Sequence, residues 1–318
     1  MLLEALYQQT YPRPDMEVIV ADGLSTDETR RRIAAFQQDF RDLKVRVIDN
    51  PRRSIPVALN RAIACAQGQV IVRLDAHSIP GPEYVSKCVD ALEKGLGENV
   101  GGIWEIRPTG SGWLARAIAA AAAHPLAVGD AHYRYTGRAR VVDTVPFGAF
   151  RRDLIDRIGD FDETLSTNED YEFNVRVRQS GGRVWLDPSI RSTYFARGSL
   201  RALARQYWRY GYWKARMLRR YPHTLRWRQA LPPLFFLSLC GSILLAPWLP
   251  PARLFLSVEV ILYTAALMLA GMHMAIRKRD FFLFPGVPLA VATMHLCWAV
   301  ALCWSFLNAT WTKHEIPG

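Results

Sequence analysis

The fold of this chain is decided by the stretch Glu17-Val-Ile-Val-Ala-Asp-Gly-Leu-Ser-Thr-Asp-Glu28. In its first five residues, Glu17 is followed by the apolar run Val-Ile-Val-Ala, which is typical of a buried β-strand. Asp22 ends the run, and helical periodicity follows over residues 26–40, with Ser25 or Thr26 as the expected N-cap. The stretch therefore predicts a strand, a short acidic turn and a helix.

The same alternation continues along the chain. We expect a second strand at residues 44–50, a helix at 55–66 and a third strand at 69–75. Strands that alternate with helices indicate parallel β-α-β units, and therefore an α/β fold. Ligands of such sheets bind beyond the carboxyl ends of the strands, where Asp22 and Asp75 both lie. Further downstream the pattern predicts strands at 100–107, 141–150 and 183–186, and helices at 113–123 and 169–180.

Charge is distributed unevenly in this chain of 318 residues, whose formal net charge is +11. Ten Lys or Arg residues fall between Arg197 and Arg228, and no acid occurs between Asp187 and Glu259. Such a basic block suits either nucleic acid or an anionic membrane surface. Because apolar segments follow the block directly, we favour membrane lipids as the partner and expect no nucleic acid.

Three apolar segments end the chain, at residues 231–249, 254–275 and 282–307. About 20 apolar residues are needed to cross a bilayer as a helix, and the second and third segments meet that length. The first contains three prolines and is open to a tight or re-entrant span. The basic block and the cluster Arg277-Lys-Arg279 place the first domain and this loop in the cytoplasm, and the C-terminus on the other side. The start of the chain does not resemble a signal peptide, which agrees with a cytoplasmic first domain.

A candidate metal site follows the third predicted strand, in Leu74-Asp-Ala-His77. Asp75 and His77 are two residues apart, so a turn would let both reach one divalent ion. Mg²⁺ or Mn²⁺ bound between such ligands and phosphate oxygens would neutralise a nucleotide diphosphate. The alternative is a capping Asp beside a surface His.

A candidate general base opens the predicted helix at 169–180, in Asn168-Glu-Asp170. Glycosyl transfer with inversion needs one group to take the proton of the attacking hydroxyl. A carboxylate held at a helix start, Asp170 with Glu169 beside it, suits that role. The alternative is that acids simply favour the first turn of a helix.

Two further candidates have equally simple structural explanations. Asp22 can accept hydrogen bonds from a nucleotide, or it can stabilise the turn before a helix. Gln206, Arg209 and Tyr210 lie in a basic amphipathic helix at residues 199–221. That helix has the pattern of one lying in the membrane interface. Arg209 can pair with a diphosphate, or the helix can bind lipid alone.

The order and spacing of these motifs resemble the inverting family 2 glycosyltransferases of the GT-A fold. Residues 17–29 resemble the family's strand that ends in Asp-Asp-Gly-Ser-Thr-Asp, and residues 60–68 resemble its Asn-x-Gly-x-x-x-Ala-x-Gly helix. Residues 74–77 occupy its Asp-x-Asp position, 168–170 its Glu-Asp motif and 206–210 its Gln-x-x-Arg-Trp motif. The resemblance covers the chain to about residue 215, and is greatest to exopolysaccharide transferases of the succinoglycan-biosynthesis glucosyltransferase type.

The resemblance implies a role for each candidate. Asp22 would bind the uracil or ribose of a UDP-sugar, and Asp75 would contact the donor ribose or diphosphate. His77 would stand where a metal-binding carboxylate is usual, holding Mg²⁺ or Mn²⁺ together with Asp75. Asp170 would be the general base, and Glu169 would position the acceptor or the donor. Three residues would lie over the diphosphate and the acceptor, namely Gln206, Arg209 and Tyr210.

The chain departs from the family pattern in three places. Gly23 replaces the second Asp of the nucleotide motif, and His77 removes one negative charge from the metal motif, which would alter metal preference. The family opens with a β-strand, whereas Met1-Leu-Leu-Glu-Ala-Leu-Tyr7 resembles the helix after that strand. We therefore expect a central strand to be missing and its neighbours' hydrogen-bonding groups to be exposed, from a misplaced start codon or a fragment.

Three parts are predicted: a GT-A domain at residues 1–195, a basic interfacial helix region at 196–230 and a membrane domain at 231–318. The leading hypothesis is a multi-pass transferase of the bacterial inner membrane with a cytoplasmic catalytic domain. It would add one sugar, expected to be glucose from UDP-glucose, to a polyprenyl-diphosphate-linked glycan in exopolysaccharide biosynthesis. The alternatives are a processive polysaccharide synthase and a non-catalytic membrane scaffold derived from a transferase.

Overall fold

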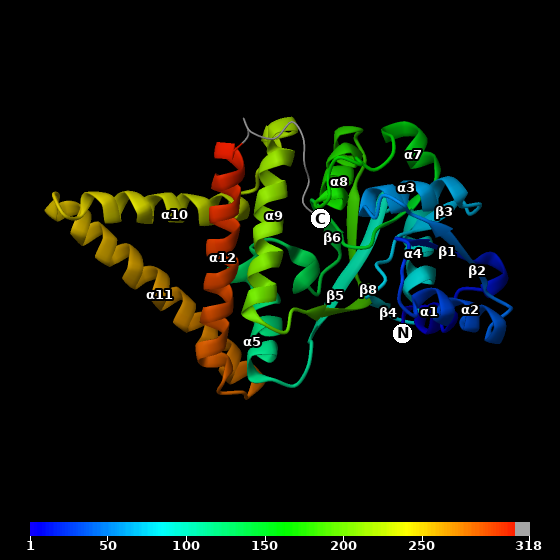
Figure 1. Cartoon of the computed structure of the whole chain (residues 1–318), viewed down its shortest axis with the longest axis horizontal. Helices are drawn as coiled ribbons and strands as arrows, with labels where there is room; N and C mark the ends of the chain where they lie inside the picture. The colour runs from blue at the N-terminus through cyan, green and yellow to red at the C-terminus, as the bar shows by residue number, and fades with distance from the viewer. Residues whose placement is uncertain (309–318) are drawn as a thin grey trace. The chain divides into compact units, whose positions relative to one another are not determined.

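The structure is a computed structural model that describes residues 1–308 and divides into two compact units (Figure 1). The first unit comprises residues 1–105 and 135–194. The second comprises residues 106–134 and the chain from residue 195 onward. The C-terminus, whose side of the membrane the sequence predicts, lies outside the described residues.

The first unit alternates helices and strands, as the α/β pattern predicts. Its helices are α1 (Leu2–Tyr7), α2 (Thr29–Asp39), α3 (Ile55–Cys65), α4 (Tyr84–Glu93), α7 (Asp153–Ile158) and α8 (Glu169–Gln179), with a 3-10 turn at Arg13–Asp15. Its strands are β1 (Glu17–Asp22), β2 (Lys44–Asp49), β3 (Val70–Val72), β4 (Ile79–Pro80), β5 (Asn99–Pro108), β6 (Arg140–Val141), β7 (Ala149–Arg151) and β8 (Val184–Ala196). The last residues of β5 and β8 belong to the second unit.

The strands form two sheets rather than one. β1 and β2 pair in parallel, with Asp22 opposite Asp49, as the β-α-β pattern predicts. The other strands form a six-stranded sheet in the order β3-β7-β5-β8-β4, with β6 beside β8. β3 pairs with β7 in the antiparallel direction, so the predicted parallel arrangement is wrong for this strand. Among the described strands none joins β1 to β3, and the expected loss of a central strand stays a prediction.

Three local predictions are corrected by hydrogen bonding. Helix α2 begins at Thr29 with Glu28 at its N-cap, because Ser25 instead donates to the Asp22 carboxylate. The third strand ends at Val72, so Asp75 follows it in a turn. The strand predicted at 141–150 is divided into β6 and β7, since the intervening Pro146 has no N–H to donate to a ladder.

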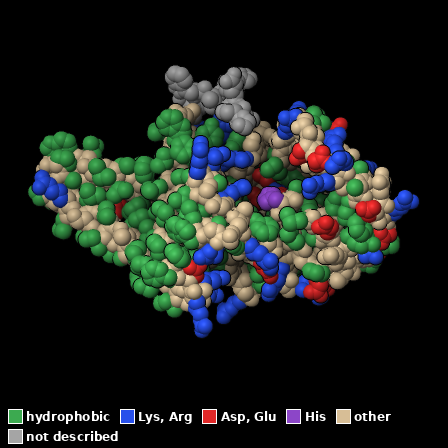
Figure 2. Space-filling model, turned by 60° about the horizontal axis from the view of Figure 1, so that its bottom comes forward, with side chains coloured by type: hydrophobic (Ala, Val, Ile, Leu, Met, Phe, Trp, Pro, Cys, Tyr) green, Lys and Arg blue, Asp and Glu red, His purple; other side chains and the backbone are tan. Residues whose placement is uncertain are grey.

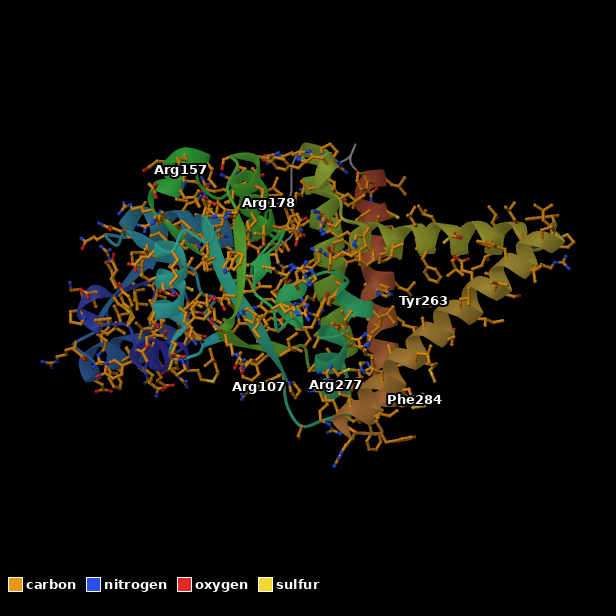
Figure 3. The ribbon with its side chains drawn as sticks, turned by 180° about the vertical axis from the view of Figure 1, so that it is seen from behind. Arg107, Arg157, Arg178, Tyr263, Arg277 and Phe284 are labelled. Carbon is orange, nitrogen blue, oxygen red and sulfur yellow. The ribbon has the colours of Figure 1, made fainter. Side chains whose placement is uncertain are left out.

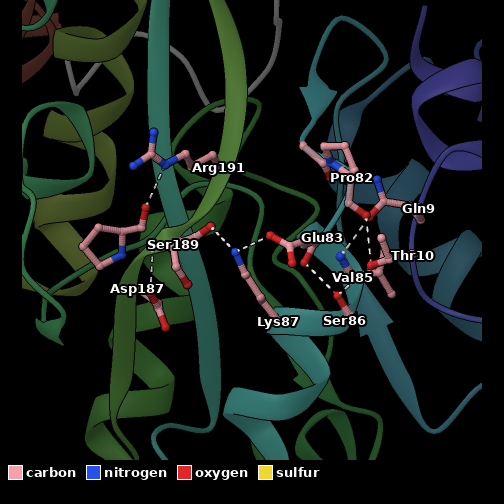
Figure 4. Close-up of polar contacts among 12 residues, drawn as sticks. Gln9, Thr10, Pro82, Glu83, Val85, Ser86, Lys87, Asp187, Ser189 and Arg191 are labelled. Carbon is pink, nitrogen blue, oxygen red and sulfur yellow. Dashed lines mark hydrogen bonds and ion pairs between the residues drawn. The ribbon is translucent and has the colours of Figure 1, made fainter.

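A buried amide holds α1 to the segment that leads into α4. The Gln9 side chain is 4 % exposed, and its Nε2 donates to the carbonyl oxygens of Ala5 and Gly81 at 2.9 and 2.8 Å. Its Oε1 accepts from the Val85 amide at 3.0 Å, in the region drawn in Figure 4. Every polar atom of this buried side chain therefore has a partner, as burial requires.

The second unit is helical. It contains α5 (Trp113–Ala122), α6 (Pro125–Val128), α9 (Leu200–Arg220), α10 (Trp227–Leu245), α11 (Pro250–Lys278) and α12 (Leu283–Leu307), with 3-10 turns at His132–Arg134 and Pro222–Thr224. By length and composition α10, α11 and α12 are each able to cross a membrane, with mean hydropathies of 1.3, 2.0 and 1.7. Figure 2 shows hydrophobic side chains gathered over the projecting part that α10 and α11 form.

Candidate active site

The turn after β3 places Asp75 at the edge of the six-stranded sheet. The Arg73 amide donates to the Gly148 carbonyl at 3.0 Å, which continues the pairing with the chain before β7. The Ser78 amide and hydroxyl then both donate to the Asp75 carbonyl, at 2.9 and 2.7 Å. The turn is closed by this carbonyl, so the half-buried Asp75 carboxylate is left for other partners.

The start of α8 brings a second acidic pair into the first unit. Asn168 occupies the N-cap in the left-handed region, with φ of 70°, a conformation that Asn adopts more readily than most residues. Glu169 is buried and Asp170 is half-buried in the first helical turn. The Tyr171 amide donates to Asp170 Oδ1 at 2.7 Å, and the positive end of the helix dipole favours these negative charges.

Arg73 connects the two acidic segments. Its Nη2 lies 2.8 Å from Glu169 Oε1 and 3.5 Å from Asp75 Oδ1. The side chains of Arg73 and Glu169 are only 8 % and 7 % exposed. Arg73 Nε and Nη1 are buried and have no hydrogen-bond partner among the described residues, so this guanidinium has donors left over. The turn after β3 and the start of α8 therefore meet around one buried cation.

Sequence reasoning missed Arg73. The signal was present, since Arg73 is a cation that directly follows an apolar strand and lies two residues before a candidate Asp. A buried charge of that kind needs a partner. The sequence alone could not name that partner, because Glu169 is 96 residues away.

The cluster shifts the pKa of Asp170 upward, to about 6. Burial is the main cause, and the negative charge of Glu169 adds to it, while the Arg73 guanidinium opposes the shift. Burial alone would lower the pKa of Arg73, but the carboxylates of Glu169, Asp75 and Asp170 raise it, so Arg73 stays charged. A carboxylate with a pKa near 6 is ionised at neutral pH and is still a better base than an exposed Asp.

The predicted metal ligands offer two donors. Asp75 is half-buried and His77 is exposed, with its ring 6.5 Å from that of Tyr194. Within residues 1–308 no group of three or more His, Cys, Asp or Glu side chains is arranged to hold a metal ion. One carboxylate and one imidazole therefore fit an ion that takes most of its ligands from substrate oxygens and water.

Asp22 is held by neighbours in its own turn. Its carboxylate accepts from the Ser25 amide at 3.0 Å and from Arg30 Nε at 2.6 Å. Burial would raise the pKa of Asp22, but the hydrogen bonds from Ser25 and the ion pair with Arg30 lower it. Arg30 also bonds to Asp49 at 2.5 Å, at the end of the neighbouring strand. These contacts give Asp22 a turn-stabilising role, and its contact with a nucleotide stays a prediction.

The remaining predicted site residues lie on α9, in the second unit. Gln206 Nε2 and the Tyr210 hydroxyl are 2.8 Å apart, one helical turn from each other. The Arg209 side chain is exposed. The predicted contacts of these three residues with the diphosphate and the acceptor stay predictions.

Comparison with known proteins identifies the family. The profile described as "Glycosyl transferase family 2" matches residues 2–159. The succinoglycan biosynthesis protein ExoA of Rhizobium meliloti (strain 1021) is 29% identical over 307 residues, which cover 93% of this chain and 88% of that protein. A Methanococcus voltae protein named dolichyl N-acetyl-alpha-D-glucosaminyl phosphate 3-beta-D-2,3-diacetamido-2,3-dideoxy-beta-D-glucuronosyltransferase is 25% identical over 300 residues, covering 92% and 88%.

A solved structure shares the fold. The mannosyltransferase PcManGT from Pyrobaculum calidifontis, in complex with GDP-Man and Mn²⁺, superposes with a TM-score of 0.63 at 21% sequence identity. The match covers 98% of this chain and 83% of PcManGT. The motifs, the fold and the relatives agree, and the chain belongs to glycosyl transferase family 2, with a GT-A-type α/β domain followed by long apolar helices.

Proposed function

We propose that this enzyme transfers a single sugar, with inversion, from a nucleotide-sugar donor to a lipid-linked glycan. UDP-glucose is the proposed donor, and a polyprenyl-diphosphate-linked glycan of exopolysaccharide biosynthesis is the proposed acceptor. The observation that carries the proposal is the meeting of Asp170, Glu169 and Asp75 around the buried Arg73. It supplies a carboxylate of raised pKa next to the turn that would receive the donor.

Asp170 is the proposed general base. Its carboxylate would take the proton of the acceptor hydroxyl as the oxygen attacks the anomeric carbon, and the nucleoside diphosphate would leave from the opposite face. Glu169 cannot serve as well, because its buried carboxylate is already paired with Arg73 at 2.8 Å. Arg73 and Glu169 would instead position Asp170 and set its proton affinity.

Asp75 and His77 would hold Mg²⁺ or Mn²⁺ against the donor. The ion, when bound, would neutralise the diphosphate and make it a better leaving group. PcManGT is described with Mn²⁺, which supports a metal in the shared fold. His77 supplies a neutral nitrogen in place of a carboxylate, so Mn²⁺ is the better candidate, since imidazole is a poor ligand for Mg²⁺.

The relatives and the second unit support the proposed acceptor and location. The name of one relative refers to succinoglycan biosynthesis, which supports a role in exopolysaccharide synthesis. The name of the other refers to a dolichyl phosphate-linked sugar, which supports an acceptor carried on a lipid. Exposed cations of α9 suit an anionic membrane surface. We therefore place the reaction at the cytoplasmic face of a bacterial inner membrane, with Arg209 as the proposed contact to the diphosphate.

The decisive experiment supplies membranes containing the full chain with radiolabelled UDP-glucose, Mn²⁺ and a polyprenyl-diphosphate-linked acceptor. We expect label in the lipid fraction, and a product longer by one residue. Asp170→Asn should lower the rate by about 10²–10⁴-fold, the usual contribution of a general base. The matched control is Asp90→Asn, which changes an exposed acid on α4 that is paired only locally with Lys94 and should leave the rate unchanged.

Each other outcome has a definite meaning. A ladder of long products would identify a processive synthase. Incorporation that is equal in Asp170→Asn and wild type would remove Asp170 from the mechanism. No incorporation with any of several nucleotide-sugars, by a chain whose circular dichroism shows that it is folded, would contradict the enzyme proposal and favour the scaffold.

A further inference from the structure

We infer that the second unit crosses the membrane twice rather than three times. In this proposal α10 and α11 form the membrane-spanning hairpin, and their exposed apolar surface contacts lipid hydrocarbon. Helix α12 lies at the membrane surface, packed against α9, although its sequence alone predicts a third span. The inference depends on contacts within the second unit and does not require the proposed function.

Helix α12 is covered by protein to a much greater extent than its two neighbours. Half of its most apolar 18-residue stretch is buried, against 11% for α10 and 17% for α11. The cover comes partly from α9, where Gly211 lies so close to α12 that a Cβ there would collide with the Trp298 carbonyl. It also comes from α5, whose Arg116 forms an ion pair with Asp280 at 2.7 Å. Helix α12 is therefore the middle of a small helical bundle.

Helix α9 runs alongside α12 and cannot be placed in hydrocarbon. Gly211 contacts Trp298 and Leu302, and the Arg219 guanidinium donates to the Ser305 carbonyl one to two turns further along. The two helices thus run side by side in the same direction, as Figure 1 shows. If α12 entered a membrane, the adjacent part of α9 would therefore enter it to the same depth.

That part of α9 carries exposed cations. Trp298 lies roughly 22 Å and 14 Å from the two ends of α12, at 1.5 Å per residue. Arg209 is two residues from Gly211, about 3 Å along the axis, and Arg205 is one turn before it. Both arginine side chains are exposed. An α12 that crossed the bilayer would hold both near mid-depth, where exposed guanidinium groups are strongly unfavourable.

The direction of α10 leads to the same conclusion. The Trp298 indole donates to the Gln229 carbonyl at 3.1 Å, which fixes the first turn of α10 beside α12. From there α10 runs transversely away from α12, as both ribbon views show (Figures 1 and 3). Helix α11 then returns obliquely to the first turn of α12. Two helices that cross transversely cannot both lie along the bilayer normal. Therefore only one of α10 and α12 can span the membrane.

The hairpin has the dimensions and surface of a membrane insert. Helix α10 has 19 residues and is about 28 Å long, close to the roughly 30 Å of the hydrocarbon core. Helix α11 has 29 residues, which suits its oblique path. Large apolar side chains on both helices are exposed, among them Leu234, Leu237, Ile243, Leu254, Leu262 and Leu269.

The few charges of the hairpin lie where a spanning hairpin tolerates them. Arg226 and Arg228 pair with Asp130 at its base, and Arg277 lies at the other end of the base. Arg253 lies near the tip, where its guanidinium donates to the carbonyls of Ala246 and Pro247 at 2.6 and 2.9 Å. The concentration of cations at the base places the base in the cytoplasm.

Glu259 is the one acid within the hairpin. The residue is half-buried, and its Oε2 is buried with no hydrogen-bond partner among the described residues. One turn further along α11, the Tyr263 ring stacks on Phe235 of α10 at 4.4 Å between centroids, and its hydroxyl lies 3.2 Å from His295 Nδ1 of α12. Polar groups are thus gathered on the inner side of the hairpin, as expected for a lipid-facing outer surface.

Reporter fusions on the full chain test the topology. A GFP–alkaline phosphatase dual reporter is placed at the C-terminus, and in separate proteins is inserted between Pro247 and Trp248 and between Arg279 and Asp280. We expect fluorescence and loss of phosphatase activity at the C-terminus and at the 279–280 insertion, and the reverse at the 247–248 tip.

The competing topologies give different patterns. An active phosphatase at the C-terminus, with fluorescence at 279–280, would overturn the inference in favour of three spans. Fluorescence at the 247–248 tip would show that the hairpin does not cross, and would also overturn it. Release of the wild-type chain from membranes by alkaline carbonate would mean that a second copy, not lipid, covers the apolar surface. Retention after that wash supports the hairpin.

Discussion

The turn after β1 and the start of α8 each carry an acid that the sequence predicts in one pocket, but their surroundings differ. Asp22 is a single carboxylate supplied with donors from Ser25 and Arg30. Asp170 belongs to a group of three carboxylates, with Glu169 and Asp75, around one cation. The pKa of Asp22 is lowered and that of Asp170 is raised. The ratio of hydrogen-bond donors to carboxylates separates an acid that stabilises a turn from an acid suited to accept a proton.

The largest effect on stability is expected from substitution of Arg73, the cation shared by Glu169 and Asp75. Arg73→Met would leave Glu169 buried without its partner at 2.8 Å, and breaking a buried ion pair costs about 3–5 kcal/mol. We expect Tm, measured by intrinsic fluorescence in detergent, to fall by on the order of 10 °C. The Tm of Arg73→Lys, which keeps the charge and loses the planar guanidinium group, should lie between those of the wild type and Arg73→Met. An unchanged Tm in Arg73→Met would show that the cluster does not hold the two segments together.

A smaller loss is expected at the β1 turn. Asp22→Asn removes the ion pair with Arg30 and weakens the bonds from Ser25, at a cost of about 1–2 kcal/mol. Because folding lowers the pKa of Asp22, its contribution is present above the unfolded pKa, about 3.9, and is lost as pH falls through the folded value. The difference in Tm between the wild type and Asp22→Asn should therefore disappear as the pH falls below about 4. The measurement is Tm against pH for both proteins.

The control for that comparison is Asp49→Asn, which removes the other, exposed partner of Arg30. Its effect on Tm should be smaller than that of Asp22→Asn. Equal effects would mean that Arg30 alone, and not the buried carboxylate, stabilises the turn. Loss of UDP-sugar binding in Asp22→Asn at unchanged Tm would instead support the nucleotide contact that the family resemblance implies.

The smallest expected change is a displacement of the pH profile. With Asp170 as base, activity should rise as pH passes about 6 from below, because the carboxylate must be ionised. Glu169→Gln removes the neighbouring negative charge that raises the pKa of Asp170, so the rising limb should move to lower pH. The measurement is kcat/KM against pH for wild type and variant. A limb that stays in place or moves to higher pH would contradict the assignment of base and positioning residue.

The sequence predicted the kind of fold well because that prediction depends on short-range patterns. The apolar run before Asp22, the parallel pairing of β1 with β2 and the three long apolar helices all follow from periodicity and composition. The shortness of β3 and the N-cap of α2 were not predictable in the same way, since side-chain and backbone partners chosen within the fold decide them.

By itself, the sequence determined the α/β class, the family and the candidate acids, because strand and helix periods and motif spacings are local properties of the chain. Only the tertiary structure decided that Arg73 joins Glu169 and Asp75, that Asp170 becomes the more basic acid, and that α12 is packed against a basic helix. Each of these depends on groups distant in sequence, and on burial, which strengthens every charge interaction by excluding water. No local pattern contains that information.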